Sequence, residues 1–200
     1  METKALLSCL RELHQQNLRT FDNGLILSDK VPCAICVLFS QNGSETNLIL
    51  TQRARHLRQH AGQISFPGGR VEENDPDIFA TALRETEEEI GLTASSIEII
   101  GDLNPLLTPT GYKVTPVLGI IQQPYTLIIN KAEVDDVLTM PLVFLKEKLC
   151  DFLTKSVAQS QLSKSAIPPL ELHFEGYRIF GLTAHILCEI GCYFQTQEEV

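Results

Sequence analysis

The sequence predicts a single α/β domain built on a mixed β-sheet with helices on its faces. Segments with the apolar pattern of strands are interleaved with segments of helical periodicity along the 200 residues, and several strand pairs are close together in sequence. No repeat, low-complexity tract or long linker interrupts the pattern. A chain of this length buries a substantial core without needing disulfides or a structural metal.

Residues 1–16 have the pattern of an amphipathic helix. Leu6, Leu7, Leu10 and Leu13 recur at helical spacing with charged residues between them, whereas a signal peptide has an uninterrupted apolar centre. No apolar run approaches the ~20 residues of a membrane span. We therefore expect a cytoplasmic protein without membrane association, in which the six cysteines stay reduced.

Short apolar segments bounded by turn residues predict the strands. These segments are residues 31–39, 47–53, 64–66, 95–103, 113–122 and 133–140, followed by a hairpin at 170–181. The first is a continuous apolar run that suits the centre of a sheet. Asn42-Gly43 predicts the turn after it, and Gly68-Gly69 predicts a second turn, where missing Cβ atoms let backbone carbonyls approach a ligand.

Helical periodicity predicts three further helices, at residues 76–90, 141–153 and 182–194. Asp75-Pro76 is the start signal of the first, with proline in the first turn. Gly91 is its stop signal. The polar residues 155–169 are expected to form a loop.

The predicted helix 76–90 contains a dense cluster of acidic residues. At ~100° per residue, Glu85, Glu88 and Glu89 share one arc of that helix, apart from the apolar arc that faces the core. Like charges at this spacing repel, and they lie toward the helix C-terminus, where negative charge is disfavoured. A solvated helix face is one explanation. A divalent cation is the other, because Mg²⁺ and Mn²⁺ prefer carboxylate oxygens.

The stretch GGRVEENDPDIFATALRETEEEIGL resembles the signature of Nudix hydrolases. The matching positions are Arg84, Glu85, Glu88, Glu89 and Gly91. The resemblance implies a Nudix box at 69–92 within one Nudix hydrolase domain, residues 1–200, with the family's α/β/α sandwich and mixed β-sheet. The loop before the helix is one residue longer than in the usual box, and this leaves the role of Asp75 open.

The resemblance also implies roles for the residues of the box. Glu85 and Glu89 are the principal ligands of Mg²⁺ or Mn²⁺, Glu88 contributes directly or through water, and the Gly68 carbonyl completes the metal site. Arg84 holds the glutamate side chains by charge-assisted hydrogen bonds. The general base is Glu85, Glu88 or a carboxylate outside the box.

Just upstream, LILTQRARHLRQHAGQISFPGG (48–69) resembles the signature of the coenzyme A pyrophosphatase branch of this family. The implied reaction is metal-dependent hydrolysis of the coenzyme A pyrophosphate to 3′,5′-ADP and 4′-phosphopantetheine. The chain has a formal net charge of −9 and a pI near 5.0, which argues against nucleic acid as a partner. An anionic small-molecule nucleotide therefore needs local cations.

Arg53, Arg55 and Arg58 supply such cations within six residues, and guanidinium groups suit phosphate oxygens. The alternative is that they pair with surface acids. Tyr112 either stacks on adenine or packs on the sheet. Glu133 is either a further acidic residue near the metals or a solvated loop residue.

Two alternatives for the function stay open. The first is a Nudix hydrolase acting on NADH, ADP-ribose or a nucleoside triphosphate, and the second is a non-catalytic Nudix binding module. The sequence does not distinguish free, oxidised and acylated coenzyme A. It also leaves the oligomeric state open, a homodimer included.

Overall fold

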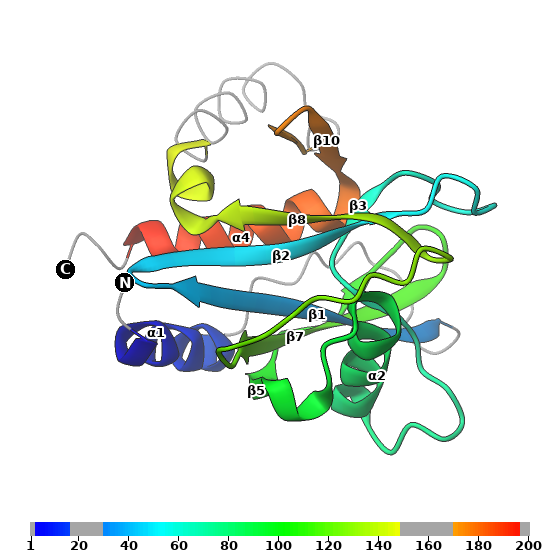
Figure 1. Cartoon of the computed structure of the whole chain (residues 1–200), viewed down its shortest axis with the longest axis horizontal. Helices are drawn as coiled ribbons and strands as arrows, with labels where there is room; N and C mark the ends of the chain where they lie inside the picture. The colour runs from blue at the N-terminus through cyan, green and yellow to red at the C-terminus, as the bar shows by residue number, and fades with distance from the viewer. Residues whose placement is uncertain (1–2, 17–29, 149–169, 197–200) are drawn as a thin grey trace.

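The computed structural model describes residues 3–16, 30–148 and 170–196, and within them eight strands form one mixed sheet (Figure 1). The strands of this sheet are β1 (Val31–Asn42), β2 (Glu45–Arg53), β3 (Ile64–Ser65), β4 (Gly68–Arg70), β5 (Ile97–Asp102), β6 (Leu106–Leu107), β7 (Tyr112–Ile121) and β8 (Val134–Pro141). A separate hairpin is formed by β9 (Glu171–Phe174) and β10 (Tyr177–Phe180). The hairpin was predicted from the sequence.

The helices cover both faces of the sheet, which confirms the predicted α/β sandwich. They are α1 (Thr3–Gln16), α2 (Ile78–Ile90), the 3₁₀ turn η1 (Ala94–Ser96) and α4 (Gly181–Thr196), and residues 142–148 are also helical. Helix α2 lies on one face, while α1 and α4 lie on the other (Figure 1). The helix predicted at 141–153 begins one residue later, because Pro141 ends β8. Its residues 149–153 and the loop predicted at 155–169 lie outside the described residues.

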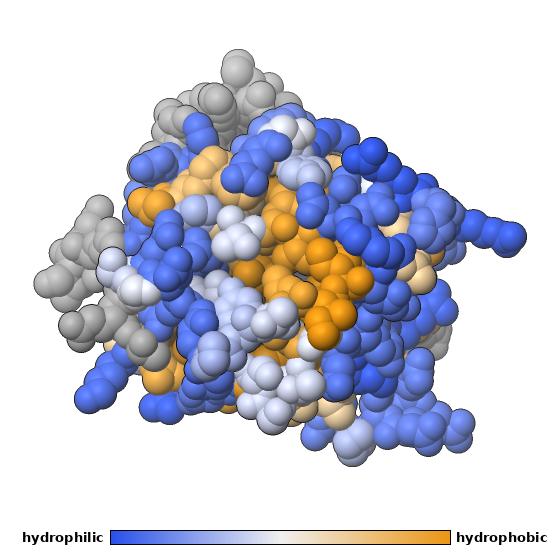
Figure 2. All heavy atoms as spheres, viewed as in Figure 1, coloured by the Kyte–Doolittle hydropathy of each residue, from blue (hydrophilic) through white to orange (hydrophobic). Residues whose placement is uncertain are grey.

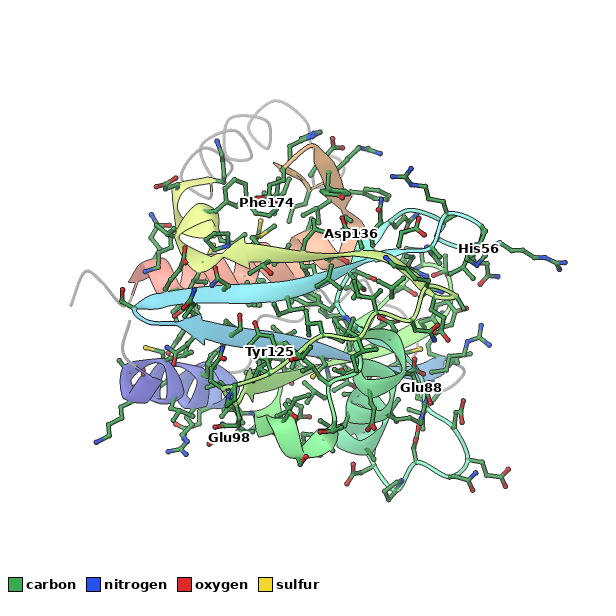
Figure 3. All side chains as sticks on the ribbon, in the orientation of Figure 1. His56, Glu88, Glu98, Tyr125, Asp136 and Phe174 are labelled. Carbon is green, nitrogen blue, oxygen red and sulfur yellow. The ribbon has the colours of Figure 1, made fainter. Side chains whose placement is uncertain are left out.

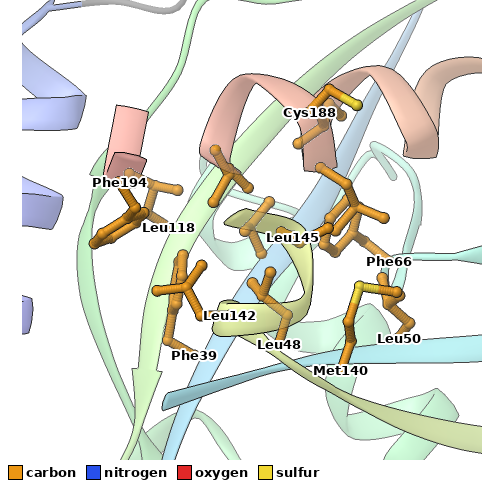
Figure 4. Close-up of a cluster of buried hydrophobic side chains, with 14 of the residues drawn as sticks. Phe39, Leu48, Leu50, Phe66, Leu118, Met140, Leu142, Leu145, Cys188 and Phe194 are labelled. Atoms are coloured by element: carbon orange, nitrogen blue, oxygen red, sulfur yellow. The ribbon is translucent and has the colours of Figure 1, made fainter. Parts of the chain in front are cut away.

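Two apolar clusters hold these layers together. The larger one joins α1 and α4 to the sheet through residues such as Leu10, Phe39 and Phe194 (Figure 4). The smaller one packs α2 on the opposite face, where Ala34, Cys36 and Leu38 of β1 meet its helical side chains. Alternate residues of β1 thus serve both clusters, as the continuous apolar run predicted.

Strand β1 is parallel to β7 on one side and antiparallel to two different strands on the other. Its second half pairs with β2, and its first half pairs with β4, so β2 diverges from β1 and the segment 64–70 fills the gap. Within this segment the Pro67 carbonyl accepts a hydrogen bond from the Cys36 N–H at 2.8 Å. The divergence places β4 beside α2.

Three local predictions were wrong. Gly68-Gly69 is not a turn but the start of β4, because glycine allows its backbone to lie directly against β1. Helix α2 begins after Asp77 rather than at Asp75-Pro76, since the Asp77 carboxylate caps it. No strand was predicted between the segments 95–103 and 113–122, yet the two-residue strand β6 lies there.

The exposed surface is mostly hydrophilic on the face seen in Figure 2, with apolar residues gathered near its middle. Ile128, in the segment that leads to β8, has 70% of its surface exposed. Within the described residues, no helix is long and apolar enough to span a membrane.

Candidate active site

Helix α2 presents the acidic cluster and has well-defined ends. The Asp77 carboxylate accepts a hydrogen bond from the Ala80 N–H at 2.8 Å, which satisfies one of the free N–H groups of the first turn. Gly91 ends the helix in a left-handed conformation, φ 73°, as its position predicted. Its N–H donates to the Glu87 carbonyl at 2.9 Å.

The three glutamates of the predicted arc do not share one environment. Glu89 is only 1% exposed and belongs to the buried face of α2. Glu85 is partly buried. Glu88 is exposed, on the outer side of α2 (Figure 3). The apolar arc of α2 does face the core, where Ala82 and Ile90 are buried and the partly buried Phe79 packs against them.

The Glu89 side chain extends from α2 to the residues of β2, where one cation lies beside it. Its carboxylate is 3.7 Å from the Arg53 guanidinium and accepts a hydrogen bond from the Thr51 hydroxyl at 3.4 Å. Burial raises the Glu89 pKa to about 8, since a carboxylate loses hydration there. Arg53 opposes this shift, whereas the nearby charges of Glu85 and Glu133 add to it.

Arg84 joins the other carboxylates of the cluster. Its guanidinium donates to Glu85 at 2.9 Å and to Glu88 at 3.1 Å, which are the hydrogen bonds that the resemblance implied. A further N–H of Arg84 donates to the Arg70 carbonyl at 3.0 Å and ties α2 to β4. Burial raises the pKa of Glu85, and the Arg84 hydrogen bond opposes that change.

Asp75 holds the opposite edge of the Arg84 guanidinium. It accepts two hydrogen bonds from Arg84, both at 3.0 Å, and one from the Thr81 hydroxyl at 2.8 Å. These donors keep the pKa of Asp75 well below its ordinary range, the Arg84 hydrogen bond being the largest cause. The acidic residue of the lengthened loop therefore orients Arg84.

The two glycines of β4 leave space for two different neighbours. A Cβ on Gly69 would overlap the Glu85 carboxylate, so the glycine gives that carboxylate its place. A Cβ on Gly68 would instead collide with the backbone of Ala34 and Ile35, and Gly68 has a φ of 154° that side chains disfavour. Gly68 thus sets the approach of β4 to β1.

The acidic cluster has the chemistry of a site for a hard divalent cation, because its side chains offer carboxylate oxygens. Among residues 3–16, 30–148 and 170–196, no group of three His, Cys, Asp or Glu side chains is already arranged to hold such an ion. Arg84 engages Glu85 and Glu88, and Arg53 engages Glu89. A metal would therefore compete with these two arginines for the carboxylates.

The predicted substrate-binding residues are not all brought together. Arg53 lies beside Glu89 and lines a large cavity. Arg55 is exposed, and its guanidinium is 3.7 Å from Asp135, which matches the alternative of a surface ion pair. Arg58 is exposed on the same loop and does not line the large cavity.

Tyr112 lines the same cavity, and its ring is already contacted. The Arg70 guanidinium lies 5.2 Å from the ring centroid of Tyr112 and donates to its hydroxyl at 2.7 Å. One side of the ring is thus covered by a cation. Arg70 was not singled out from the sequence, although it follows Gly69 directly.

The large cavity has a volume of about 830 Å³. It is bordered by β4 and the end of β2 on one side, and by β6, the start of β7 and the first turn of α4 on the other. Arg53, Gly68 and Gly69 line it and also adjoin the acidic cluster. The cavity therefore adjoins the acidic cluster, although none of the described glutamates lines it.

The family model of the NUDIX domain matches residues 29–149, a range that includes β4, α2 and Glu133. The chain belongs to the Nudix family. It is 39% identical over 159 residues to a protein of Escherichia fergusonii named "Uncharacterized Nudix hydrolase NudL", covering 74% of each chain. A protein of the same name from Shigella boydii is 38% identical over the same length and the same shares.

Solved structures of this fold also superpose on the chain. One is an Ap4A hydrolase from C. elegans in a binary complex, which is 19% identical with a TM-score of 0.48. The match covers 66% of this chain and 99% of that one. As a Nudix hydrolase, the protein belongs to a family that acts on small nucleotide substrates with divalent metal ions.

Glu133, which sequence reasoning left undecided, lies near the acidic cluster. Its backbone carbonyl accepts a hydrogen bond from the Ala54 N–H at 2.7 Å, which fixes the loop before β8 against the end of β2. Its charge raises the pKa of both Glu85 and Glu89. It therefore adds a fourth carboxylate near the cluster. The signal in the sequence was only its position just before a strand.

Proposed function

We propose that this Nudix hydrolase cleaves the pyrophosphate of coenzyme A, or of a coenzyme A derivative, to 3′,5′-ADP and 4′-phosphopantetheine. The observation that carries the proposal is the contact between Arg53 and Glu89. Arg53 belongs to the segment 48–69 that resembles the coenzyme A branch, and Glu89 belongs to the Nudix box. Their contact supports a substrate-binding role for the one segment beside a catalytic role for the other.

The residues of α2 and β4 suit a divalent cation. Glu85, Glu88 and Glu89 would hold Mg²⁺ or Mn²⁺ together with the Gly68 carbonyl, all of them oxygen ligands. When bound, the ion supplies positive charge to the diphosphate and makes a bound water more acidic. Buried Glu89 gains most from such a charge, because its only close cation is Arg53 among the described residues.

The chain's own groups position the reactants. Arg53 places a guanidinium at the border of the carboxylate cluster and the cavity, where a diphosphate would lie. Arg84 is held on one edge by Asp75 and orients Glu85 and Glu88 with the other. The carboxylate that accepts the proton of water is one of Glu85, Glu88 and Glu133.

The test is a substrate panel analysed by mass spectrometry of the products. Wild-type protein with Mg²⁺ or Mn²⁺ should release 3′,5′-ADP and 4′-phosphopantetheine from coenzyme A, whereas Glu89→Gln should not. Glu87→Gln is the matched control, since Glu87 is exposed on the same helix. A clear preference for NADH, ADP-ribose or a nucleoside triphosphate would overturn the specificity, and no cleavage of any diphosphate would favour a binding module.

A further inference from the structure

The large cavity has its charge at one end only. Of its described lining residues, Arg53 and Arg70 are the only ones of the types Lys, Arg, Asp and Glu. Both lie on the β2 and β4 side, next to the acidic cluster. The remaining length of the cavity is bounded mainly by aliphatic side chains. These are Ile35, Leu106, Leu107, Val114, Leu170 and Leu182.

The sheet register orders these residues from the charged end to the apolar end. Arg70 pairs with Cys33, Cys33 with Val114, and Val114 with Leu106, so the four residues form one row across β4, β1, β7 and β6. Directly paired residues present their side chains to the same face of a sheet. Three strand spacings of ~4.8 Å make this row roughly 14 Å long.

The same register places the acidic cluster on the other face of β4. Gly69 is one residue before Arg70, and successive residues of a strand face opposite sides. A Cβ on Gly69 would accordingly meet Glu85 of α2, while Arg70 lines the cavity. Arg53 and Gly69 nevertheless line the cavity as well as adjoining the acidic cluster. A substrate whose diphosphate lies beside these two residues can therefore extend one of its two arms along the row.

We propose that this cavity binds the uncharged pantetheine arm of the substrate and leaves the nucleotide arm outside it. The inference rests on the proposed function and assigns the orientation of coenzyme A in the site. The 3′-phosphate of the nucleotide arm needs a cation, and the described residues of the apolar end offer none of Lys or Arg. The pantetheine arm carries amides, methyl groups and a thiol, and no charge.

The polar groups that remain in the cavity suit an amide chain. Gly181, Leu182 and Thr183 belong to the first turn of α4 and line the cavity. Backbone N–H groups of a first turn have no partner within their helix, so they can donate to amide carbonyls. The thiol end of the arm then lies among leucines and valine. The nucleotide is left toward the exposed loop of Arg55 and Arg58.

The test separates the two halves of the substrate. Leu182→Trp places a bulky ring in the apolar end of the cavity, and Val143→Trp is the matched control, because Val143 is 56% exposed and does not line the cavity. Pantetheine and 3′,5′-ADP are each titrated as inhibitors of coenzyme A hydrolysis. We expect Leu182→Trp to weaken pantetheine about tenfold or more and to leave 3′,5′-ADP unchanged.

Other outcomes overturn the orientation. If Leu182→Trp weakens 3′,5′-ADP instead, the nucleotide occupies the cavity. If both inhibitors bind as they do to Val143→Trp, neither arm does. Failure of wild-type protein to cleave coenzyme A contradicts the proposed function, and it is a separate result. Leu106→Trp tests the facing wall should Leu182→Trp unfold.

A measurement without mutation completes the test. Wild-type protein with pantetheine should show intermolecular NOEs from the paired methyl groups of pantetheine to methyl groups of Leu106 and Val114. NOEs from 3′,5′-ADP to these residues, without any from pantetheine, would reject the assignment.

Discussion

The Arg53 guanidinium lies 3.7 Å from the Glu89 carboxylate, which is almost completely buried. Arg53 ends β2 at an irregularity in its pairing with β8, and Glu89 sits in the last turn of α2. This contact thus links the end of β2 to α2, at the place where β2 diverges from β1. Glu89 is also the most buried carboxylate among the residues that the structure describes.

Replacing Glu89 by glutamine should separate stability from activity. The amide replaces a carboxylate that we propose as a metal ligand, so we expect kcat/KM to fall by about 100-fold. It also removes a carboxylate that is costly to ionise in a buried position, so metal-free protein should unfold at a higher temperature at pH 9. Thermal unfolding and steady-state kinetics measure the two effects. If Glu89→Gln and Glu87→Gln have the same melting temperature at pH 9, the predicted stabilisation is wrong.

The metal-free stability should fall as pH rises. The Glu89 pKa is about 8 in the folded protein against an ordinary 4.5. Between those values the folded protein keeps a proton that the unfolded chain has lost, so this group lowers the free energy of unfolding as pH increases through the interval. Chemical denaturation of wild type and Glu89→Gln at pH 6 and pH 9 measures the difference. The free energy of unfolding of the variant should not show this decrease with pH.

The same protonation predicts proton release on metal binding. Below about pH 8 Glu89 holds a proton that Mn²⁺ must displace, because metals bind the carboxylate form. Affinity for Mn²⁺ should therefore increase from pH 6 to pH 8 and then level off. Calorimetry in two buffers of different ionisation enthalpy counts the protons released. Equal heats in the two buffers at pH 7 would show that Glu89 is not a ligand.

Arg53, Arg55 and Arg58 should contribute unequally to the hydrolysis of coenzyme A. Arg53 is half-buried between Glu89 and the cavity, whereas the Arg55 side chain is 76% exposed beside Asp135. We expect Arg53→Ala to reduce kcat/KM for coenzyme A by ~100-fold, about the value of a charge-assisted contact to phosphate. Arg55→Ala and Arg58→Ala should change it only a few-fold. Kinetics of the three variants at one salt concentration provide the comparison.

The spacing of apolar residues located the long strands and helices, because burial of one face of an element dictates that spacing. The apolar run of β1 and the glycine that ends α2 are local signals, and both were interpreted correctly. The environment of Glu89 could not be predicted, because a helical arc says which residues share a face and not where β2 and Arg53 lie. Gly68-Gly69 was misassigned for a related reason. Its strand conformation depends on β1, more than 30 residues away in sequence.

Asp75 shows how a departure from a motif can be understood only in three dimensions. Counting residues left its role open, whereas the structure gives it two hydrogen bonds to Arg84. We expect Asp75→Asn to reduce kcat with little change in KM, since Arg84 would lose its fixed orientation toward Glu85 and Glu88. Because the pKa of Asp75 is lowered in the folded state, its contribution to stability is present at neutral pH and is lost on acidification. Acid unfolding of the variant should therefore be less steep.

The two glycines of β4 provide a matched pair that separates folding from function. Gly68→Ala sets a methyl group against the backbone of Ala34, which cannot move aside, at a φ that alanine disfavours. It should destabilise the protein by about 2 kcal/mol or more. Gly69→Ala meets only the end of the Glu85 side chain, which can rotate away. It should fold normally, bind Mn²⁺ less tightly and lose activity. Equal melting temperatures for the two variants would mean that β4 does not depend on Gly68 for its approach to β1.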